Sequence, residues 1–189
     1  MADGFVRWYR ESGDVSVFGE QAGLFRRYGI VLEHPVAGAA LVLNVEGDDV
    51  PMEQEELRRL LGLRLASITM NWWFSADTNV IGSFTHEPFG CEVQTLWLDG
   101  LSPEEAGTVE AAVTAAAAGL PTPSRAVIVD RRGIHDPEDW DSIVLHEGDG
   151  FPGVPDCVIA GEAVTRKLLA AEPGLGEEDL GGGLVRLTR

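Results

Sequence analysis

Apolar and polar residues alternate most regularly in the stretch 65–98, which holds three of the five tryptophans. In the first part of this stretch every second residue is apolar, namely Ile68, Met70, Trp72 and Phe74. A period of two is typical of a half-buried strand. Polar turn residues at 77–79 and a second break at 87–90 separate two further extended segments. The pattern predicts an antiparallel meander over about residues 65–98, with one face in the core.

Trp73 breaks the simple division into a core face and a solvent face. If Trp72 points into the core, the pleat of the strand sends Trp73 to the opposite face, beside Thr69 and Asn71. A large apolar ring on that face needs either a covering element or a ligand. We expect a helix to cover it, and the alternative is a binding surface.

Apolar residues at spacings of three and four predict three or four helices around this sheet. The clearest begins at Ser102-Pro103-Glu104-Glu105, which combines a capping box with proline at the first helical position. A short helix near 20–28 is the weakest of the set. The three principal helices are predicted at Pro51–Leu61, Pro103–Ala118 and Glu162–Ala171.

The remaining apolar segments predict shorter strands. Phe5–Tyr9 and Val15–Phe18 suggest an N-terminal hairpin, and Trp140–Leu145 suggests a later strand. The glycine-rich tail 174–183 is expected to be mobile, before an edge strand at Leu184–Leu187. The sequence therefore predicts an α+β fold with a mainly antiparallel sheet packed by three to four helices. We expect a single domain over residues 1–189, with residues 1–50 as a candidate subregion.

Charge narrows the classes of partner. The chain has 31 acidic and 14 basic residues, which gives a net charge of −17. Phosphate backbones are bound through Lys and Arg, so nucleic acid is not an expected partner, and an anionic membrane surface would be repelled. A field of this sign attracts basic proteins, although it also serves simply to keep a protein soluble.

Cysteines and hydropathy indicate the compartment. Cys91 and Cys157 lie far apart in sequence and belong to no CxxC pair, so reduced thiols in the cytoplasm are expected. The N-terminus has no basic region followed by an apolar run, and no stretch approaches the roughly 20 apolar residues that span a bilayer. We therefore expect a cytoplasmic protein without membrane insertion.

His86 is the best candidate for chemistry among the four histidines, because it ends the second strand of the meander beside Glu87 and near Cys91. A Cys/His pair could supply a nucleophile. However, neighbouring residues on a strand point to opposite faces, and the HExxH, GxGxxG, GxxxxGK[ST] and GxSxG motifs are absent. No catalytic residue, metal site or cofactor is therefore predicted.

Two functions remain as hypotheses. The first is a non-catalytic, acidic protein-binding module, immunity-like or inhibitor-like, that neutralises a basic protein such as a toxin or nuclease. The alternative is a small-molecule-binding domain or enzyme with a pocket on the polar face of the meander. Of these two hypotheses, the small-molecule-binding domain or enzyme is the less favoured. The candidate ligand- or partner-binding residues are Asn71, Trp73, His86, Glu87 and Gln94.

Overall fold

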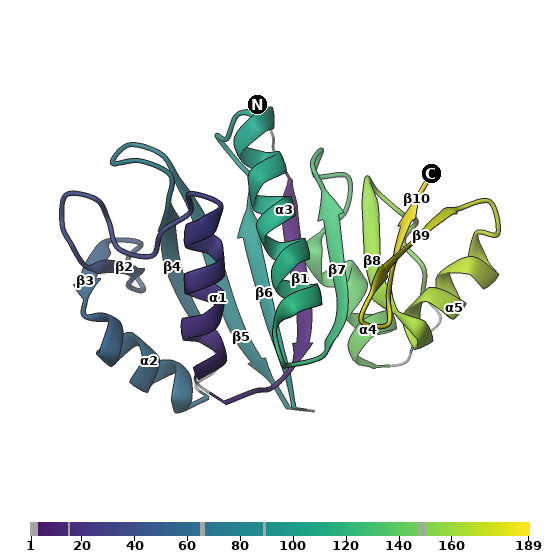
Figure 1. The fold of residues 1–189 in the computed structure, drawn as a ribbon, viewed down its shortest axis with the longest axis horizontal. Helices are drawn as coiled ribbons and strands as arrows, with labels where there is room; N and C mark the ends of the chain where they lie inside the picture. Colours follow the sequence, from purple (N-terminus) through teal and green to yellow (C-terminus); the bar gives the residue numbers. More distant parts are fainter. Residues whose placement is uncertain (1–3, 15, 65–66, 89, 147, 149) are drawn as a thin grey trace.

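The computed structural model describes residues 4–14, 16–64, 67–88, 90–146, 148 and 150–189. In this part of the chain, ten strands form one sheet in the order β3-β2-β4-β5-β6-β1-β7-β8-β10-β9, and helices pack on both faces (Figure 1). All neighbouring strands pair antiparallel, so the predicted α+β class with a mainly antiparallel sheet is confirmed. The strands are β1 (Phe5–Glu11), β2 (Ala40–Leu43), β3 (Asp49–Met52), β4 (Ser67–Trp73), β5 (Asn79–Glu87), β6 (Cys91–Trp97), β7 (Ser124–Asp130), β8 (Cys157–Gly161), β9 (Gly176–Gly181) and β10 (Leu184–Thr188).

The described residues also form five α-helices and one 3₁₀ helix, against the three or four helices that the sequence predicts. The strands β4, β5 and β6 follow one another as antiparallel neighbours, while Leu65 and Ala66 lie outside the described residues. The helices are α1 (Ser16–Arg27), α2 (Gln54–Gly62), α3 (Pro103–Gly119), η1 (Pro137–Trp140), α4 (Asp141–Leu145) and α5 (Glu162–Ala171).

The strand β1 lies in the middle of the sheet, between β6 and β7. The predicted hairpin partner of this strand, Val15–Phe18, is wrong: Val15 lies outside the described residues, and the following residues begin helix α1. Val17, Phe18, Gln21 and Phe25 are buried along that helix. This helical spacing extends over three turns, so it outweighs the short extended pattern at its start.

One face of the sheet is covered by α1, α2 and α3, which lie in front of it in Figure 1. Trp72 points into this layer, as predicted, and its ring lies 4.9 Å from that of Phe25 between centroids. The predicted capping box of α3 is present: Ser102 accepts from the Glu105 N–H, and the Glu105 carboxylate accepts from the Ser102 N–H. This face therefore holds the larger hydrophobic core.

On the opposite face, η1, α4 and α5 cover β1, β7, β8 and β10. The strand predicted at Trp140–Leu145 is wrong, because these residues end η1 and form α4. Pro137 occupies the first turn of η1, and Trp140, Ile143 and Val144 are buried at helical spacing. Over β4 and β5, no helix in the described part of the chain covers this face (Figure 1).

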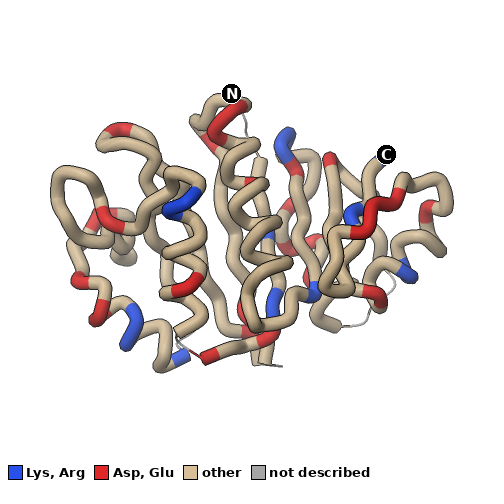
Figure 2. Tube along the Cα trace, in the orientation of Figure 1, with Lys and Arg blue, Asp and Glu red and all other residues tan. Residues whose placement is uncertain are grey.

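The two edge strands differ most from expectation. Residues 176–181 form β9, so the predicted mobile tail is an edge strand, and β10 lies between β8 and β9 rather than at the edge. At the other edge, Pro51 belongs to β3, and α2 begins at Gln54. Proline is tolerated there because an edge strand pairs on one side only. Three consecutive carboxylates lie on β9, and one lies at the start of β3; charges on an edge strand discourage pairing with another sheet (Figure 2).

Candidate functional site

The five candidate residues from the sequence do not converge on one pocket. The pairing register places Asn71, Trp73 and Glu87 on the face that carries α4. His86 and Gln94 lie on the other face, because His86 is opposite Glu92 and Gln94 is opposite Phe84. The proposed pocket on a single polar face is therefore split between two sides of the sheet.

Trp73 is buried by a loop rather than by a helix. Its exposed fraction is 7%, and its ring lies edge-on to the His34 ring at 4.4 Å between centroids. Its backbone exchanges two hydrogen bonds with Val31, at 2.7 and 2.9 Å. Asn71 is also buried, and its side-chain amide donates to Asp49 Oδ1 and accepts from Asn79 Nδ2. Both residues therefore have structural partners.

Among the described residues, Trp97 is the exposed aromatic residue on this face. Ile81 and Trp97 face each other across β5 and β6 and are 39% and 36% exposed. The Trp97 ring also makes an edge contact with Phe5. Two partly exposed hydroxyl residues lie beside the pair, Ser83 on β5 and Thr69 on β4, whereas Thr95 on β6 is buried and accepts from Arg7. We define the open sheet face as Thr69, Ile81, Ser83 and Trp97.

Carboxylates border the open sheet face. Asp77 lies in the turn between β4 and β5, Asp99 follows Trp97 by two residues, and both are exposed. Glu138 is 3.7 Å from the Arg7 guanidinium, which itself is buried. Arg7 is held by two bonds to Asp141, at 2.8 and 3.0 Å, so its charge is balanced within the protein. The exposed charged residues at this border, Asp77, Asp99 and Glu138, are therefore all negative.

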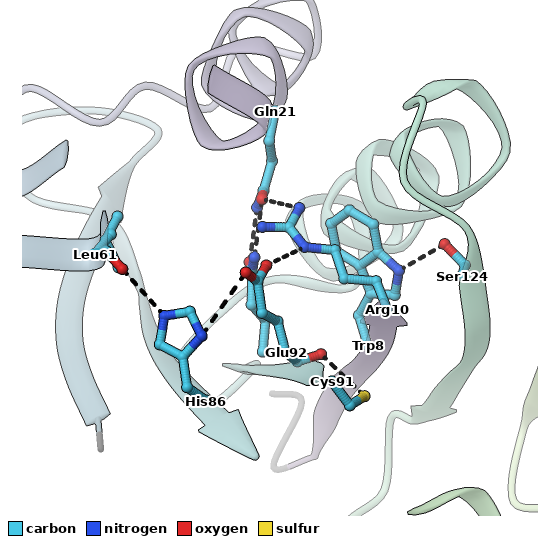
Figure 3. Close-up of polar contacts among 9 residues, drawn as sticks. Trp8, Arg10, Gln21, Leu61, His86, Cys91, Glu92 and Ser124 are labelled. Carbon is cyan, nitrogen blue, oxygen red and sulfur yellow. Dashed lines mark hydrogen bonds and ion pairs between the residues drawn. The ribbon is translucent and has the colours of Figure 1, made fainter. Parts of the chain in front are cut away.

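A second site lies on the opposite face, where Arg10 is buried among polar and aromatic groups (Figure 3). Its Nε donates to Glu92 Oε2 at 2.8 Å, and its Nη1 donates to Gln21 Oε1 at 2.9 Å. The guanidinium also lies 4.9 Å from the centroid of the Trp8 ring. Burial lowers the pKa of Arg10, and the charge of Glu92 opposes that effect. Gln94 joins the network through Gln21.

His86 borders this network with one nitrogen unpaired. Its Nε2 lies 3.2 Å from the Leu61 carbonyl oxygen, which can only accept, so Nε2 carries the hydrogen. Its Nδ1 lies 3.7 Å from Glu92 Oε1 and has no hydrogen-bond partner among the described residues. The side chain is 10% exposed and lines a pocket of about 190 Å³. We call this the His86 pocket.

The cysteines do not complete a nucleophilic site. Cys91 is paired with Glu87 across β5 and β6, on the face opposite His86, so the two do not form a Cys/His pair. Burial raises the pKa of the Cys91 thiol to about 11 and that of Cys157 to about 12. Thiols with such values are poor nucleophiles near neutral pH.

Arg10, Glu92, Ile81 and Trp97 are the site residues that sequence reasoning missed. The signal for the first two was a charged residue among the apolar residues of a strand, Arg10 within Phe5–Glu11 and Glu92 within Cys91–Trp97. Among the described residues, no three His, Cys, Asp or Glu side chains could hold a metal ion together. None of the described helices is both long and apolar enough to cross a membrane.

Comparison with known proteins adds no relative: no protein-family model, no curated protein and no solved structure matches this chain. The open sheet face is a surface over strands β4, β5 and β6, and the His86 pocket is a small polar cavity.

Proposed function

We propose that this chain is a non-catalytic, acidic protein-binding module that neutralises a basic protein partner, in an immunity-like or inhibitor-like role. The observation that carries the proposal is the exposed pair Ile81 and Trp97 on a part of the sheet that no described helix covers. Grouped apolar side chains on a surface are typical of interaction sites, and tryptophan is enriched among the residues that dominate binding energy.

The polar surroundings of this pair suit a protein partner. Ser83 and Thr69 are partly exposed beside it, and their hydroxyl groups can form the polar rim that surrounds the apolar centre of an interface. The net charge of −17 and the bordering carboxylates favour a basic partner, since complementary charge accelerates encounter and disfavours acidic competitors. A partner presenting an apolar residue ringed by Lys and Arg would match both features.

The absence of catalysis is part of the proposal and is supported by the placement of reactive groups. Cys91 and His86 lie on opposite faces, and the pKa of each thiol is raised by burial. A small-molecule-binding function is the alternative, and the His86 pocket favours it.

Capture of partners from an extract of the source cells tests the proposal. The test variant combines Ile81→Thr and Trp97→Thr, because threonine keeps a high strand propensity. Val45→Thr is the matched control, since Val45 is 97% exposed and lies in the turn between β2 and β3. We expect wild type and control to retain a basic protein that the double variant loses. Loss of a central tryptophan should cost about 2 kcal/mol or more, or roughly 30-fold in Kd, by titration of the purified partner.

Two results would contradict the proposal. One is the recovery of no basic protein by the wild type at low ionic strength, where charge attraction is strongest. The other is equal affinity of the double variant and the wild type for the recovered protein, which would place the contact elsewhere on the surface.

A further inference from the structure

The His86 pocket lies between α1, α2 and the adjoining ends of β5 and β6, on the opposite side of the sheet from the open sheet face. Its volume of about 190 Å³ corresponds to roughly six water-sized groups. His86 and Glu92 are buried in its wall, whereas Asp14 and Arg64 are exposed at its mouth. A site here is thus independent of the proposed protein-binding surface.

Two hydrogen-bond acceptors meet in the wall of the pocket. Because Nε2 of His86 donates to the Leu61 carbonyl oxygen, Nδ1 presents a lone pair when the ring carries a single hydrogen. Oε2 of Glu92 accepts a hydrogen bond from Arg10 Nε, and Oε1 of Glu92 lies 3.7 Å from Nδ1 of His86. When Nδ1 carries no hydrogen, both atoms are acceptors, and a donor bound between them would satisfy both. One nitrogen with several N–H bonds can lie within about 3 Å of each.

We propose that the His86 pocket binds a small primary amine, with its ammonium group between Glu92 Oε1 and His86 Nδ1. An ammonium carries three donors, so it can satisfy both acceptors and still contact a third. Arg10 also lines the pocket and already pairs with Glu92 Oε2, so the attraction for an ammonium comes from Glu92 Oε1 and from the carbonyl end of α2, which terminates at Gly62 beside the pocket. Phe18 supplies an apolar wall for a short aliphatic chain.

The mouth of the pocket determines what the other end of the amine carries. Asp14 accepts the Ser16 N–H, and this bond lowers the pKa of Asp14, so the carboxylate remains charged and would attract a second ammonium. Arg64 would instead attract a carboxylate. Its φ of +50° is in the left-handed region, as is common for the residue after a helix C-cap, here that of α2. Diamines and amino acids therefore bind the same inner site through one ammonium group and differ in the second charged group, which contacts Asp14 or Arg64 at the mouth.

Titration of the full-length, ¹⁵N-labelled protein, followed by NMR of the histidine side chains, tests the proposal. The probes are butylamine, 1,4-diaminobutane and 4-aminobutyrate. His135 is an internal control, because its Nε2 also pairs with a carbonyl oxygen and its Nδ1 also lies near a carboxylate, that of Asp130. We expect all three amines to shift the His86 Nδ1 resonance saturably, with a Kd on the order of 1 mM, and to leave His135 unchanged.

Substitutions then locate each end of the ligand. His86→Phe should weaken all three probes by about tenfold or more, as expected for loss of a hydrogen bond to a charged group. Asp14→Asn should weaken only the diamine, and Arg64→Gln only 4-aminobutyrate. The proposal is overturned if no probe shifts His86, if His135 shifts equally, or if a folded His86→Phe variant binds as tightly as wild type. The wild-type spectra decide the matter even if that variant does not fold.

Discussion

Replacing Glu92 by glutamine probes how the fold tolerates the buried Arg10. The substitution keeps the shape of the side chain and removes the negative charge 2.8 Å from Arg10 Nε. Arg10 is 1% exposed, so its guanidinium cannot reach solvent without local unfolding. An arginine does not lose its proton in a protein, so the charge remains and is no longer balanced. We therefore expect a large loss of stability.

The magnitude follows from the burial of the pair. Breaking a buried ion pair by removing one partner costs about 3–5 kcal/mol. Glutamine retains one oxygen that can still accept from Arg10, so we expect a value near the lower end, about 3 kcal/mol. This is a substantial share of the roughly 5–15 kcal/mol that stabilises a typical domain. With a urea m-value of about 2 kcal/mol per molar, the midpoint should fall by roughly 1.5 M.

Urea unfolding followed by tryptophan fluorescence measures this change. Glu56→Gln serves as the matched control, because the Glu56–Arg59 pair has side chains that are 47% and 58% exposed. Exposed pairs contribute little, so the control should unfold near the wild-type midpoint. A double variant, Arg10→Met with Glu92→Leu, should recover much of the loss by removing both charges. The reasoning fails if Glu92→Gln matches the control, or if the double variant is no more stable than the single one.

Three further predictions concern other parts of the fold. Gly82→Ala should lower the urea midpoint by the equivalent of roughly 1–3 kcal/mol, since a Cβ there would lie 3.0 Å from Trp72 Nε1; an unchanged midpoint would show that the ring can move. Because burial raises the pKa of Cys91 to about 11, a thiol reagent should label it much more slowly in the native protein than in urea, as read by mass spectrometry, and equal rates would contradict this. The hydrogen bond from the Ser102 N–H lowers the pKa of Glu105 below its usual 4.5. The stability that the Glu105 carboxylate contributes is therefore complete above pH 4.5 and is lost as the pH falls through the lower pKa of the folded state. Glu105→Gln should reduce this loss in urea midpoints measured down to about pH 3, and equal losses in variant and wild type would refute the assignment.

Local pattern was sufficient wherever one element carries its own signal. The helix α3 begins at the capping box Ser102–Glu105, and the interactions that define it span only three residues. The alternation that includes Trp72 is an equally local property, and it correctly assigned Trp72 to the core. The α+β class with a mainly antiparallel sheet followed from such signals, because the local backbone conformation sets the spacing of side chains on one face, 3.6 residues in a helix and two in a strand.

Edge elements and short helices were beyond local pattern. The strand β9 is acidic and rich in glycine, and it exists because β10 offers it a pairing partner. The helix α4 contains Ile143 and Val144, which favour strands locally, but the burial of Trp140 with both against the sheet decides for a helix. In both cases tertiary contacts outweigh intrinsic propensity.

The candidate sites divide in the same way. The sequence alone indicated that Trp73 faces away from Trp72 and that His86 lies beside charged groups. It could not show that Val31 and His34 cover Trp73 while Trp97 stays exposed, nor that Arg10 reaches Glu92 across 82 residues of chain. Alternation determines which side chains share a face of one strand. Only the register between strands and the elements packed on them decide which side chains meet and which remain open to a partner.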